Sequence, residues 1–184
     1  MTLHTTYFGS VDWYAALLCA DEPVTIDTAE HYIKQTTRNH CLIATAGGVQ
    51  KLTVPVTVPS ATAGHGKPLT RDVRISDHGN WRHLHWQALS SAYGQSPFFD
   101  YYADDIRPFF EQRWEFLVDY NQAITEKMSE LIGKPYPTLI NEEKQKTKTY
   151  YQTFQRRHGF IAGLSILDLL FNMGPEAILI LSNN

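Results

Sequence analysis

The aspartate near the end of the chain is the residue whose surroundings most suggest chemistry. Asp168 lies in the apolar run 166–171, where an ionised carboxylate is costly to bury. Such a carboxylate is expected to meet a lysine or arginine, or to orient a substrate and act as a base. Because it is the third residue after Ser165, it can instead complete a helix cap, which needs no ligand. Asn172, one helical turn later, is placed to share the same face as a substrate-binding residue.

A second polar group occupies residues 34–39, between a predicted strand and a predicted hairpin. Arg38 can hold a carboxylate or phosphate through two parallel hydrogen bonds, and Lys34 can neutralise its charge. Asn39 adds an amide that can donate or accept a hydrogen bond. These three residues are therefore candidate ligands of an anionic substrate. The alternative is an ordinary solvated loop, since a run of charge is usually an exposed surface.

The predicted helix 81–93 carries a polar and aromatic stripe beside its apolar one. Arg82, Trp86 and Tyr93 follow one another at spacings of four and seven residues, so they lie on one side of the helix. A cation with two amphipathic aromatic residues suits a sugar or a nucleobase, because aromatic faces stack and their polar atoms form hydrogen bonds. The alternative is a helix packed on both sides, with Trp86 in the core. His85 is a candidate for proton transfer, because the ordinary pKa of histidine lies near neutrality.

Several familiar motifs are incomplete. The loop 64–67 reads Gly-His-Gly-Lys but lacks the first glycine and the Ser or Thr of a phosphate-binding loop. No dinucleotide fingerprint follows the first predicted strand, and no Gly-x-Ser-x-Gly elbow is present. His83 and His85 are two residues apart, so on a helix they point about 200° apart and do not chelate one ion. We therefore predict no metal site and no cofactor.

The first part of the chain predicts a small sheet. We expect strands at 3–8, 24–27, 41–45, 49–56 and 73–76. The first two flank a helix capped by Ser10, so they form a βαβ unit with parallel strands. The next two flank Gly47 and Gly48, which predict the tight turn of a hairpin. The prediction is an α/β (or α+β) fold in which the βαβ unit is extended by the hairpin into a mixed sheet.

The second part predicts helices. We expect them at 81–93, 97–105 and 117–133, and from Ser165 to Gly174. The lysine-rich segment 134–148 contains prolines and little apolar content, so we expect it to be solvated and mobile. The C-terminal half is therefore helical, apart from this segment.

Composition limits the class of protein. Charged residues make up 19% of the 184, and the formal net charge is −3, so no broad basic field attracts nucleic acid or anionic lipid. No stretch approaches the roughly 20 apolar residues of a membrane span. We expect a single domain over residues 1–184, located in the cytoplasm, with neither nucleic acid nor a membrane as a partner. The expected ligand is an anionic or sugar-like small molecule that is held locally.

Together these residues resemble the WbqC-like protein family over nearly the whole chain. The matching segments are Tyr7-Phe8, Tyr14, 34–39, 52–56, His85-Trp86, 92–94, 96–99, Tyr101-Tyr102, and 164–172 before Gly174. The resemblance adds Tyr7 to the candidate substrate-binding residues. Many members carry His-Gln-Pro after the first strand, whereas this chain reads His4-Thr5-Thr6.

The resemblance implies a transferase. The family takes its name from a protein of O-antigen gene clusters and is described, from gene context, as an aminoacyl (glycine) transferase. We therefore expect an aminoacyl or sugar-related transferase of O-antigen or surface-polysaccharide assembly, with Asp168 and His85 as its catalytic candidates. The alternative is a non-catalytic module that binds an anionic metabolite or a biosynthetic partner protein. Either function requires loop 34–39, helix 81–93 and the segment after Ser165 to line one shared hollow.

Overall fold

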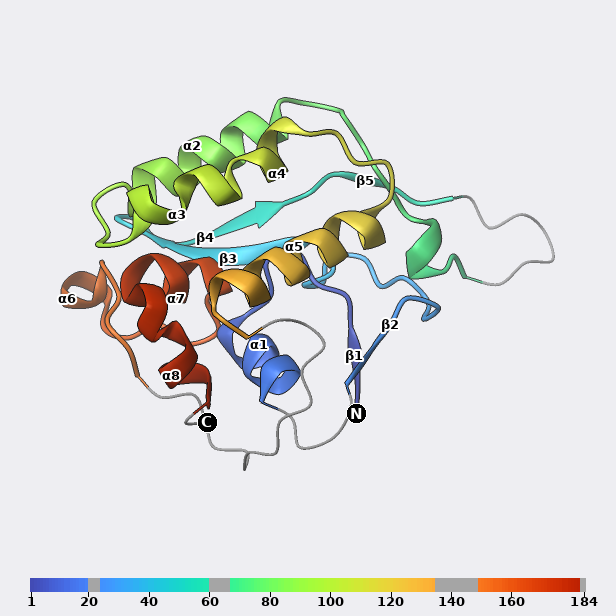
Figure 1. The fold of residues 1–184 in the computed structure, drawn as a ribbon. Helices are drawn as coiled ribbons and strands as arrows, with labels where there is room; N and C mark the ends of the chain where they lie inside the picture. The colour runs from blue at the N-terminus through green and yellow to red at the C-terminus, as the bar shows by residue number, and fades with distance from the viewer. Residues whose placement is uncertain (20–23, 60–66, 135–148, 183–184) are drawn as a thin grey trace.

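The computed structural model describes residues 1–19, 24–59, 67–134 and 149–182. Figure 1 shows a hairpin of two strands, β3 (His40–Thr45) and β4 (Gly48–Thr53), with helices on both sides. The helices on one side are α2 (Trp81–Tyr93), α3 (Phe99–Ile106) and α4 (Pro108–Glu111), and those on the other are α1 (Val11–Leu18), α5 (Leu117–Leu131), α7 (Ile166–Met173) and α8 (Ala177–Ser182). Shorter turns are η1 (Thr70–Asp72), α6 (Gln155–His158) and η2 (Gly174–Glu176). The α/β class and the helical C-terminal half are confirmed.

The N-terminal βαβ unit is confirmed as well. β1 (Thr2–His4) and β2 (Thr25–Asp27) pair in parallel, and α1 lies between them in the chain. Ser10 is the N-cap of α1, and its Oγ accepts a hydrogen bond from the backbone N–H of Trp13 at 3.2 Å. The predicted cap therefore fixes where this helix begins.

β1 ends at His4, four residues before the predicted end. Beyond it, the backbone N–H of Tyr7 donates to the carbonyl of Thr37 at 2.9 Å, so the segment pairs with loop 34–39 instead of β2. Residues 5–8 are all buried. The chain thus carries Tyr7 directly from the edge of the sheet into the core.

The predicted hairpin is confirmed, and Gly48 at its turn has φ +114°, a conformation that glycine adopts without steric cost. A further antiparallel pair joins β5 (Val56–Thr57) and β6 (Arg74–Ile75). Among the described residues the strands form three two-stranded sheets, one parallel and two antiparallel. Both kinds of pairing expected of a mixed sheet are present, but in separate sheets. Pro55 lies between β4 and β5 and lacks the N–H that a continuous ladder needs.

One cluster of buried apolar side chains joins the two sides of the hairpin. Ile43 on β3, Leu89 on α2 and Leu169 on α7 are all fully enclosed. Both α2 and α7 contact β3. Aromatic rings link the helices to each other, as where the ring centroids of Phe99 and Phe171 lie 5.1 Å apart. The hairpin therefore lies between helices from distant parts of the chain and packs against helices on both sides.

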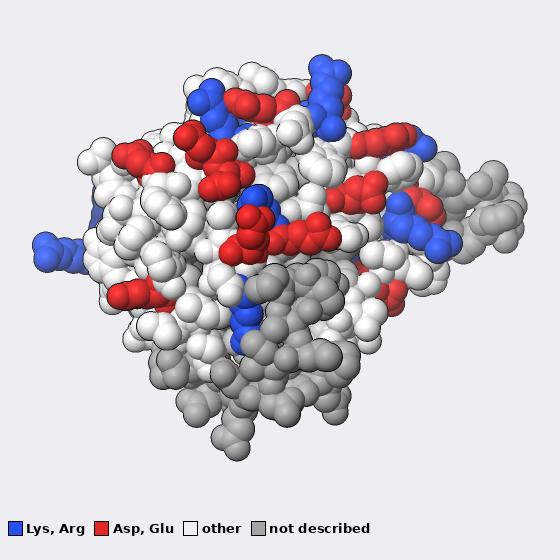
Figure 2. All heavy atoms as spheres, in the orientation of Figure 1, with Lys and Arg blue, Asp and Glu red and all other residues white. Residues whose placement is uncertain are grey.

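Charged side chains are interspersed on the face shown in Figure 2, where Lys and Arg lie among Asp and Glu. Several form surface ion pairs, such as Arg107 with Glu111 and Lys127 with Glu130. Exposed pairs of this kind contribute little to stability. Within the described ranges, every helix is too short or too polar to cross a bilayer.

The predicted solvated segment 134–148 lies outside the described residues, except for Lys134. That residue is buried, and its Nζ lies 3.6 Å from Cys19 Sγ. For Lys134 the prediction of a solvated side chain is wrong, because the end of α5 directs it inward.

Candidate functional site

Asp168 is fully enclosed in the first turn of α7, with 0% exposure. Its Oδ2 accepts a hydrogen bond from the hydroxyl of Tyr150 at 2.9 Å, whereas its Oδ1 has no hydrogen-bond partner among the described residues. Burial raises the pKa of this carboxyl to about 6, and the hydroxyl groups of Tyr150 and Tyr93 oppose the shift. Asp168 is therefore a buried acid that titrates close to neutral pH.

The helix-cap interpretation of Asp168 is wrong. In a capping box, the third residue of the helix accepts a hydrogen bond from the backbone N–H of the N-cap residue. Here the N–H of Ser165 donates instead to the carbonyl of Leu42 at 2.9 Å. Ser165 is the N-cap, but its own Oγ accepts the N–H of Leu167. The carboxylate is thus not needed to begin the helix.

Tyr93 and Asn172 surround the same acid. The Tyr93 hydroxyl accepts the N–H of Ala44 at 3.1 Å, and the charge of Asp168 adds to the effect of burial in raising the pKa of Tyr93. Asn172 Nδ2 donates to the carbonyl of Asp168 at 2.7 Å, and its Oδ1 accepts from Thr153 Oγ1 at 2.7 Å. Both predicted substrate-binding residues are buried parts of this centre.

A separate cavity of about 330 Å³ opens beside the start of α2 and α4. We call it the basic pocket; its lining residues are Asp77, Gly79, Asn80, Arg82, His83, Trp86, Arg107, Phe110, Glu111 and Arg113. Three arginines and a histidine outnumber its two carboxylates. Its volume lies in the range of small-molecule sites.

Arg82 is the most enclosed cation of the basic pocket, with a side chain 14% exposed. Its Nη1 donates to Asp77 Oδ1 at 2.7 Å, and its guanidinium carbon lies 4.5 Å from the ring centroid of Trp81. Its Nε and Nη2 are buried without a hydrogen-bond partner among the described residues. A buried N–H without an acceptor is costly, so this guanidinium retains unused capacity to bind an anion.

Trp86 satisfies both interpretations that the sequence offers. Its ring stacks on Phe99, with centroids 5.9 Å apart and planes at 30°, and lies 5.8 Å from the ring of Phe110. It also lines the basic pocket and is only partly buried. The ring of Trp86 is thus held in place by Phe99 and Phe110, while another part of it borders the cavity.

His85 points away from solvent, into the core behind the basic pocket. Its Nδ1 lies 2.9 Å from the hydroxyl of Tyr7, and its ring lies 5.2 Å from that of Trp81. Burial lowers the pKa of His85 to about 4, and a hydrogen bond with the backbone of Thr53 opposes this shift. The near-neutral pKa predicted for His85 is therefore wrong. The imidazole is neutral at physiological pH and holds Tyr7 in place.

The cations of loop 34–39 are arranged differently from the prediction. Arg38 Nε and Nη2 donate to the two carboxylate oxygens of Glu30 at 2.7 and 2.6 Å, so the two-pronged contact expected for a ligand is made within the chain. Asn39 Nδ2 donates to the carbonyl of Val54 at 3.0 Å. Lys34 is exposed. The arginine and the amide stabilise the entry to the hairpin.

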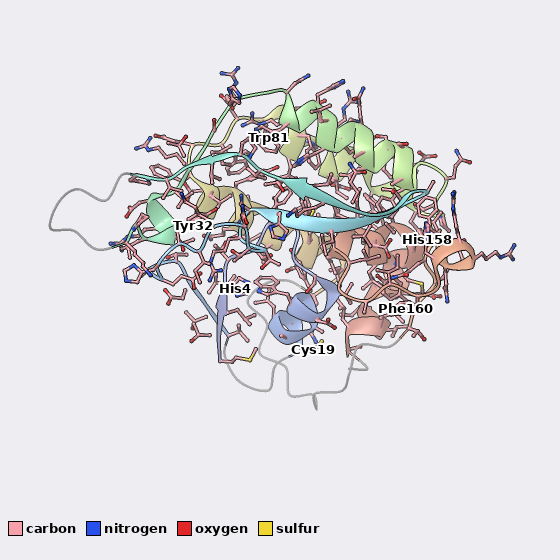
Figure 3. The ribbon with its side chains drawn as sticks, turned by 180° about the vertical axis from the view of Figure 1, so that it is seen from behind. His4, Cys19, Tyr32, Trp81, His158 and Phe160 are labelled. Atoms are coloured by element: carbon pink, nitrogen blue, oxygen red, sulfur yellow. The ribbon has the colours of Figure 1, made fainter. Side chains whose placement is uncertain are left out.

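The expected shared hollow is not formed, and that prediction is wrong. Arg82 and Trp86 line the basic pocket, whereas Tyr93 and Asn172 lie with Asp168. Figure 3 shows Trp81, next to Arg82 in the chain, on one side of the hairpin and Phe160 on the other. The ring of Phe160 lies 5.5 Å from that of Tyr150, the hydrogen-bond partner of Asp168. The hairpin separates the two groups.

Three residues at these sites were missed by sequence reasoning. Arg107 lies between α3 and α4, and Arg113 lies in the loop after α4; neither belongs to a motif in the sequence. Tyr150 follows the lysine-rich segment with no spacing that links it to Asp168. Arg113 contacts Asp77 and Tyr150 contacts Asp168, so for these two residues the signal is tertiary, because each contact joins elements far apart in the chain.

A metal centre is not apparent in the described part of the chain, where no three His, Cys, Asp or Glu side chains are grouped so as to hold an ion. The absence of a cofactor stays a prediction. The basic pocket offers guanidinium groups, an imidazole, two carboxylates and aromatic faces, and the centre around Asp168 offers one buried carboxyl.

The structure is that of an α/β protein with a cavity beside the start of α2. A family model described as the WbqC-like protein family matches residues 5–148, and the chain belongs to that family. The basic pocket lies within the matched region, whereas Tyr150 and Asp168 follow it. No curated protein and no solved structure matches the chain.

Proposed function

We propose that the chain is a transferase of O-antigen or surface-polysaccharide assembly that holds the anionic, sugar-like part of a donor or acceptor in the basic pocket. The class of reaction comes from the family resemblance, which implies aminoacyl or sugar-related transfer. The binding half of the proposal comes from the geometry of the pocket. We expect a sugar-like ligand to contact Arg82 and Trp86, because both residues line this cavity.

The observation that carries the proposal is the incomplete coordination of Arg82. Asp77 engages only one edge of its guanidinium, and the enclosed Nε and Nη2 have no acceptor among the described residues. A ligand carboxylate or phosphate supplies acceptor oxygens with the spacing that guanidinium prefers. Arg107 and Arg113 line the same cavity and add positive charge.

Trp86 supplies the surface for the sugar. The apolar face of a pyranose packs against aromatic rings, and the partly buried indole is held in one orientation by Phe99 and Phe110. A fixed ring loses little conformational entropy on binding. Arginine and tryptophan together therefore favour an acidic sugar or a sugar phosphate over a neutral sugar.

The second candidate is a non-catalytic module that binds the same ligand. One observation favours it: the two predicted catalytic residues, Asp168 and His85, do not line the basic pocket. In that case the pocket binds and presents an anionic metabolite. The two functions share the ligand and differ in turnover.

Binding is tested with glucuronate and glucose, which differ in one carboxylate. We expect saturable binding of glucuronate by isothermal titration calorimetry and at least about tenfold weaker binding of glucose. R82Q is expected to remove this preference, whereas R74Q, which breaks the exposed Arg74–Glu115 pair, is the matched control and should keep it. Equal affinity for the two sugars, or equal behaviour of the two variants, contradicts the proposal.

Turnover separates the transferase from the module. The protein is incubated with nucleoside-diphosphate sugars or aminoacyl donors and with sugar acceptors, and products are detected by mass spectrometry. A transferred group that appears with wild type and R74Q but is lost with R82Q supports the transferase. Glucuronate binding without any transferred group supports the module.

A further inference from the structure

A second cavity, of about 250 Å³, lies on the other side of the hairpin from the basic pocket. We call it the Tyr150 cavity; it is lined by Val11, Asp12, Tyr150, Phe160, Ile161, Ala162 and Gly163. Most of its wall is apolar. The rings of Tyr150 and Phe160 meet edge to face, with centroids 5.5 Å apart and planes at 88°. The cavity can therefore enclose a small aromatic or aliphatic group.

Two side chains of the Tyr150 cavity, Tyr150 and Asp12, can accept hydrogen bonds. Tyr150 is buried, with 6% exposure, and its hydroxyl proton is directed to Asp168 Oδ2, so its oxygen retains lone pairs for a donor. A hydroxyl polarised by a carboxylate is a stronger acceptor than a free one. Asp12, exposed in the first turn of α1, adds an acceptor at the wall.

The described side chains that line the cavity carry a net negative charge. Among its described lining residues Asp12 is charged, and no lysine or arginine faces it there. Asp168 lies directly behind Tyr150. Burial raises the pKa of Tyr150, the charges of Asp168 and Asp12 add to the shift, and the amide of Gln152 opposes it. Both carboxylates thus act at the tyrosine hydroxyl.

We propose that the Tyr150 cavity is a binding site for a small organic amine, whose apolar body packs between the aromatic walls and whose ammonium group meets Tyr150 and Asp12. A primary ammonium donates three hydrogen bonds and accepts none, which suits the two acceptor side chains in this largely apolar wall. The faces of Tyr150 and Phe160 also attract a cation. This site does not depend on the function proposed for the basic pocket, since the two cavities share no lining residue.

The test uses benzylamine, benzyl alcohol and benzoate, three probes of nearly equal size that are cationic, neutral and anionic. Binding is followed at pH 7.5 by the backbone amide signals of Ala162 and Gly163 in ¹H–¹⁵N NMR spectra. We expect saturable shifts with benzylamine and at least about tenfold weaker binding of benzyl alcohol and benzoate. Benzyl alcohol that binds as tightly as benzylamine, or benzylamine that leaves these signals unchanged, overturns the proposal.

Two variants test which atoms hold the amine. Y150F removes the polarised hydroxyl but keeps the aromatic wall, and is expected to weaken benzylamine binding about tenfold. D12N is expected to weaken it about threefold, because exposed ion pairs are weak. D119N is the matched control, since Asp119 is also an exposed acid in the first turn of a helix, α5, and lies outside the cavity. Equal affinity of D12N and D119N, together with unchanged affinity of Y150F, overturns the proposal.

Discussion

The basic pocket and the centre around Asp168 handle charge in opposite ways. In the pocket, most charges are exposed, as in the Arg107–Glu111 pair, whereas Arg82 is largely enclosed and paired with Asp77 through one nitrogen. At Asp168 a single carboxyl is enclosed, and a tyrosine hydroxyl contacts one of its oxygens. Solvated charges can be exchanged for those of a ligand at little cost, whereas a buried charge affects the stability of the whole fold. Substitutions at Asp168 are therefore expected to change the stability of the fold, whereas substitutions in the basic pocket are expected to change ligand affinity by a smaller amount.

The largest expected effect is on stability, at Asp168. Its pKa rises from 3.8 to about 6 on folding, so the native state binds the proton more tightly than the unfolded chain. The stabilisation is fully present below pH 3.8 and is lost as the pH rises through about 6. The loss amounts to about 3 kcal/mol. The ionised carboxylate of Asp168 therefore lowers the unfolding free energy at neutral pH, as is common for residues that are retained for function.

D168N isolates this effect, because asparagine does not titrate. We expect the difference in unfolding free energy between D168N and wild type to change by about 2.5 kcal/mol in favour of D168N between pH 4 and pH 8. The measurement is urea unfolding followed by circular dichroism at several pH values, with D119N as the control. A difference that is constant with pH would show that Asp168 is not a buried titrating acid.

The Arg38–Glu30 pair sharpens the comparison between exposed and enclosed charge. Arg38 is 6% exposed, and two of its nitrogens donate hydrogen bonds to the two carboxylate oxygens of Glu30. E30Q leaves the guanidinium without its counter-ion, so we expect a loss of about 2 kcal/mol in unfolding free energy. Glucuronate affinity should not change.

Urea unfolding and calorimetry of the same samples check both parts, with the exposed E126Q on α5 as the control. If E30Q leaves stability intact but weakens glucuronate binding, Arg38 belongs to the ligand site after all. The conclusion that loop 34–39 lies apart from the ligand site would then be wrong.

The smallest expected effect lies in the basic pocket, at Asp77. Arg82 and Arg113 both contact this exposed carboxylate, at 2.7 and 3.5 Å, so it competes with a ligand anion for them. The Arg82 guanidinium lowers the pKa of Asp77, which keeps it ionised. We expect D77N to strengthen glucuronate binding about threefold.

Calorimetry at low and high salt measures this gain, and it should shrink as salt screens the pocket. D100N, an exposed acid on α3, serves as the control. A weaker affinity of D77N would mean that Asp77 orients Arg82 for the ligand and does not compete with it.

The sequence predicts the local elements well because their signals are local. The βαβ unit, the hairpin and the helix beginning at Ser165 follow from caps, turns and periodicity, which act within a few residues. The pairing of Arg82 with Trp86 in one pocket is also local, since four residues return to the same helix face. These parts of the fold and site need no tertiary information.

The convergence of the candidate residues was not predictable in this way. Tyr93 lies on the same side of α2 as Trp86, but seven residues place it about 10 Å further along the axis. There α2 faces β3 and α7, so the Tyr93 hydroxyl meets Ala44 and Asp168 instead of the pocket. Likewise, nothing in loop 34–39 indicates that Glu30 takes both edges of Arg38. Partners from other elements decide both outcomes.

The central claim is that two independent sites of opposite charge preference lie on the two sides of the hairpin. It is tested by titrating ¹⁵N-labelled protein with glucuronate and benzylamine, singly and together. We predict that glucuronate shifts the amides of Arg82, His83 and Trp86, that benzylamine shifts those of Ala162 and Gly163, and that saturation with one leaves the affinity for the other unchanged. Competition between the probes, or shifts of the same amides by both, would contradict the claim.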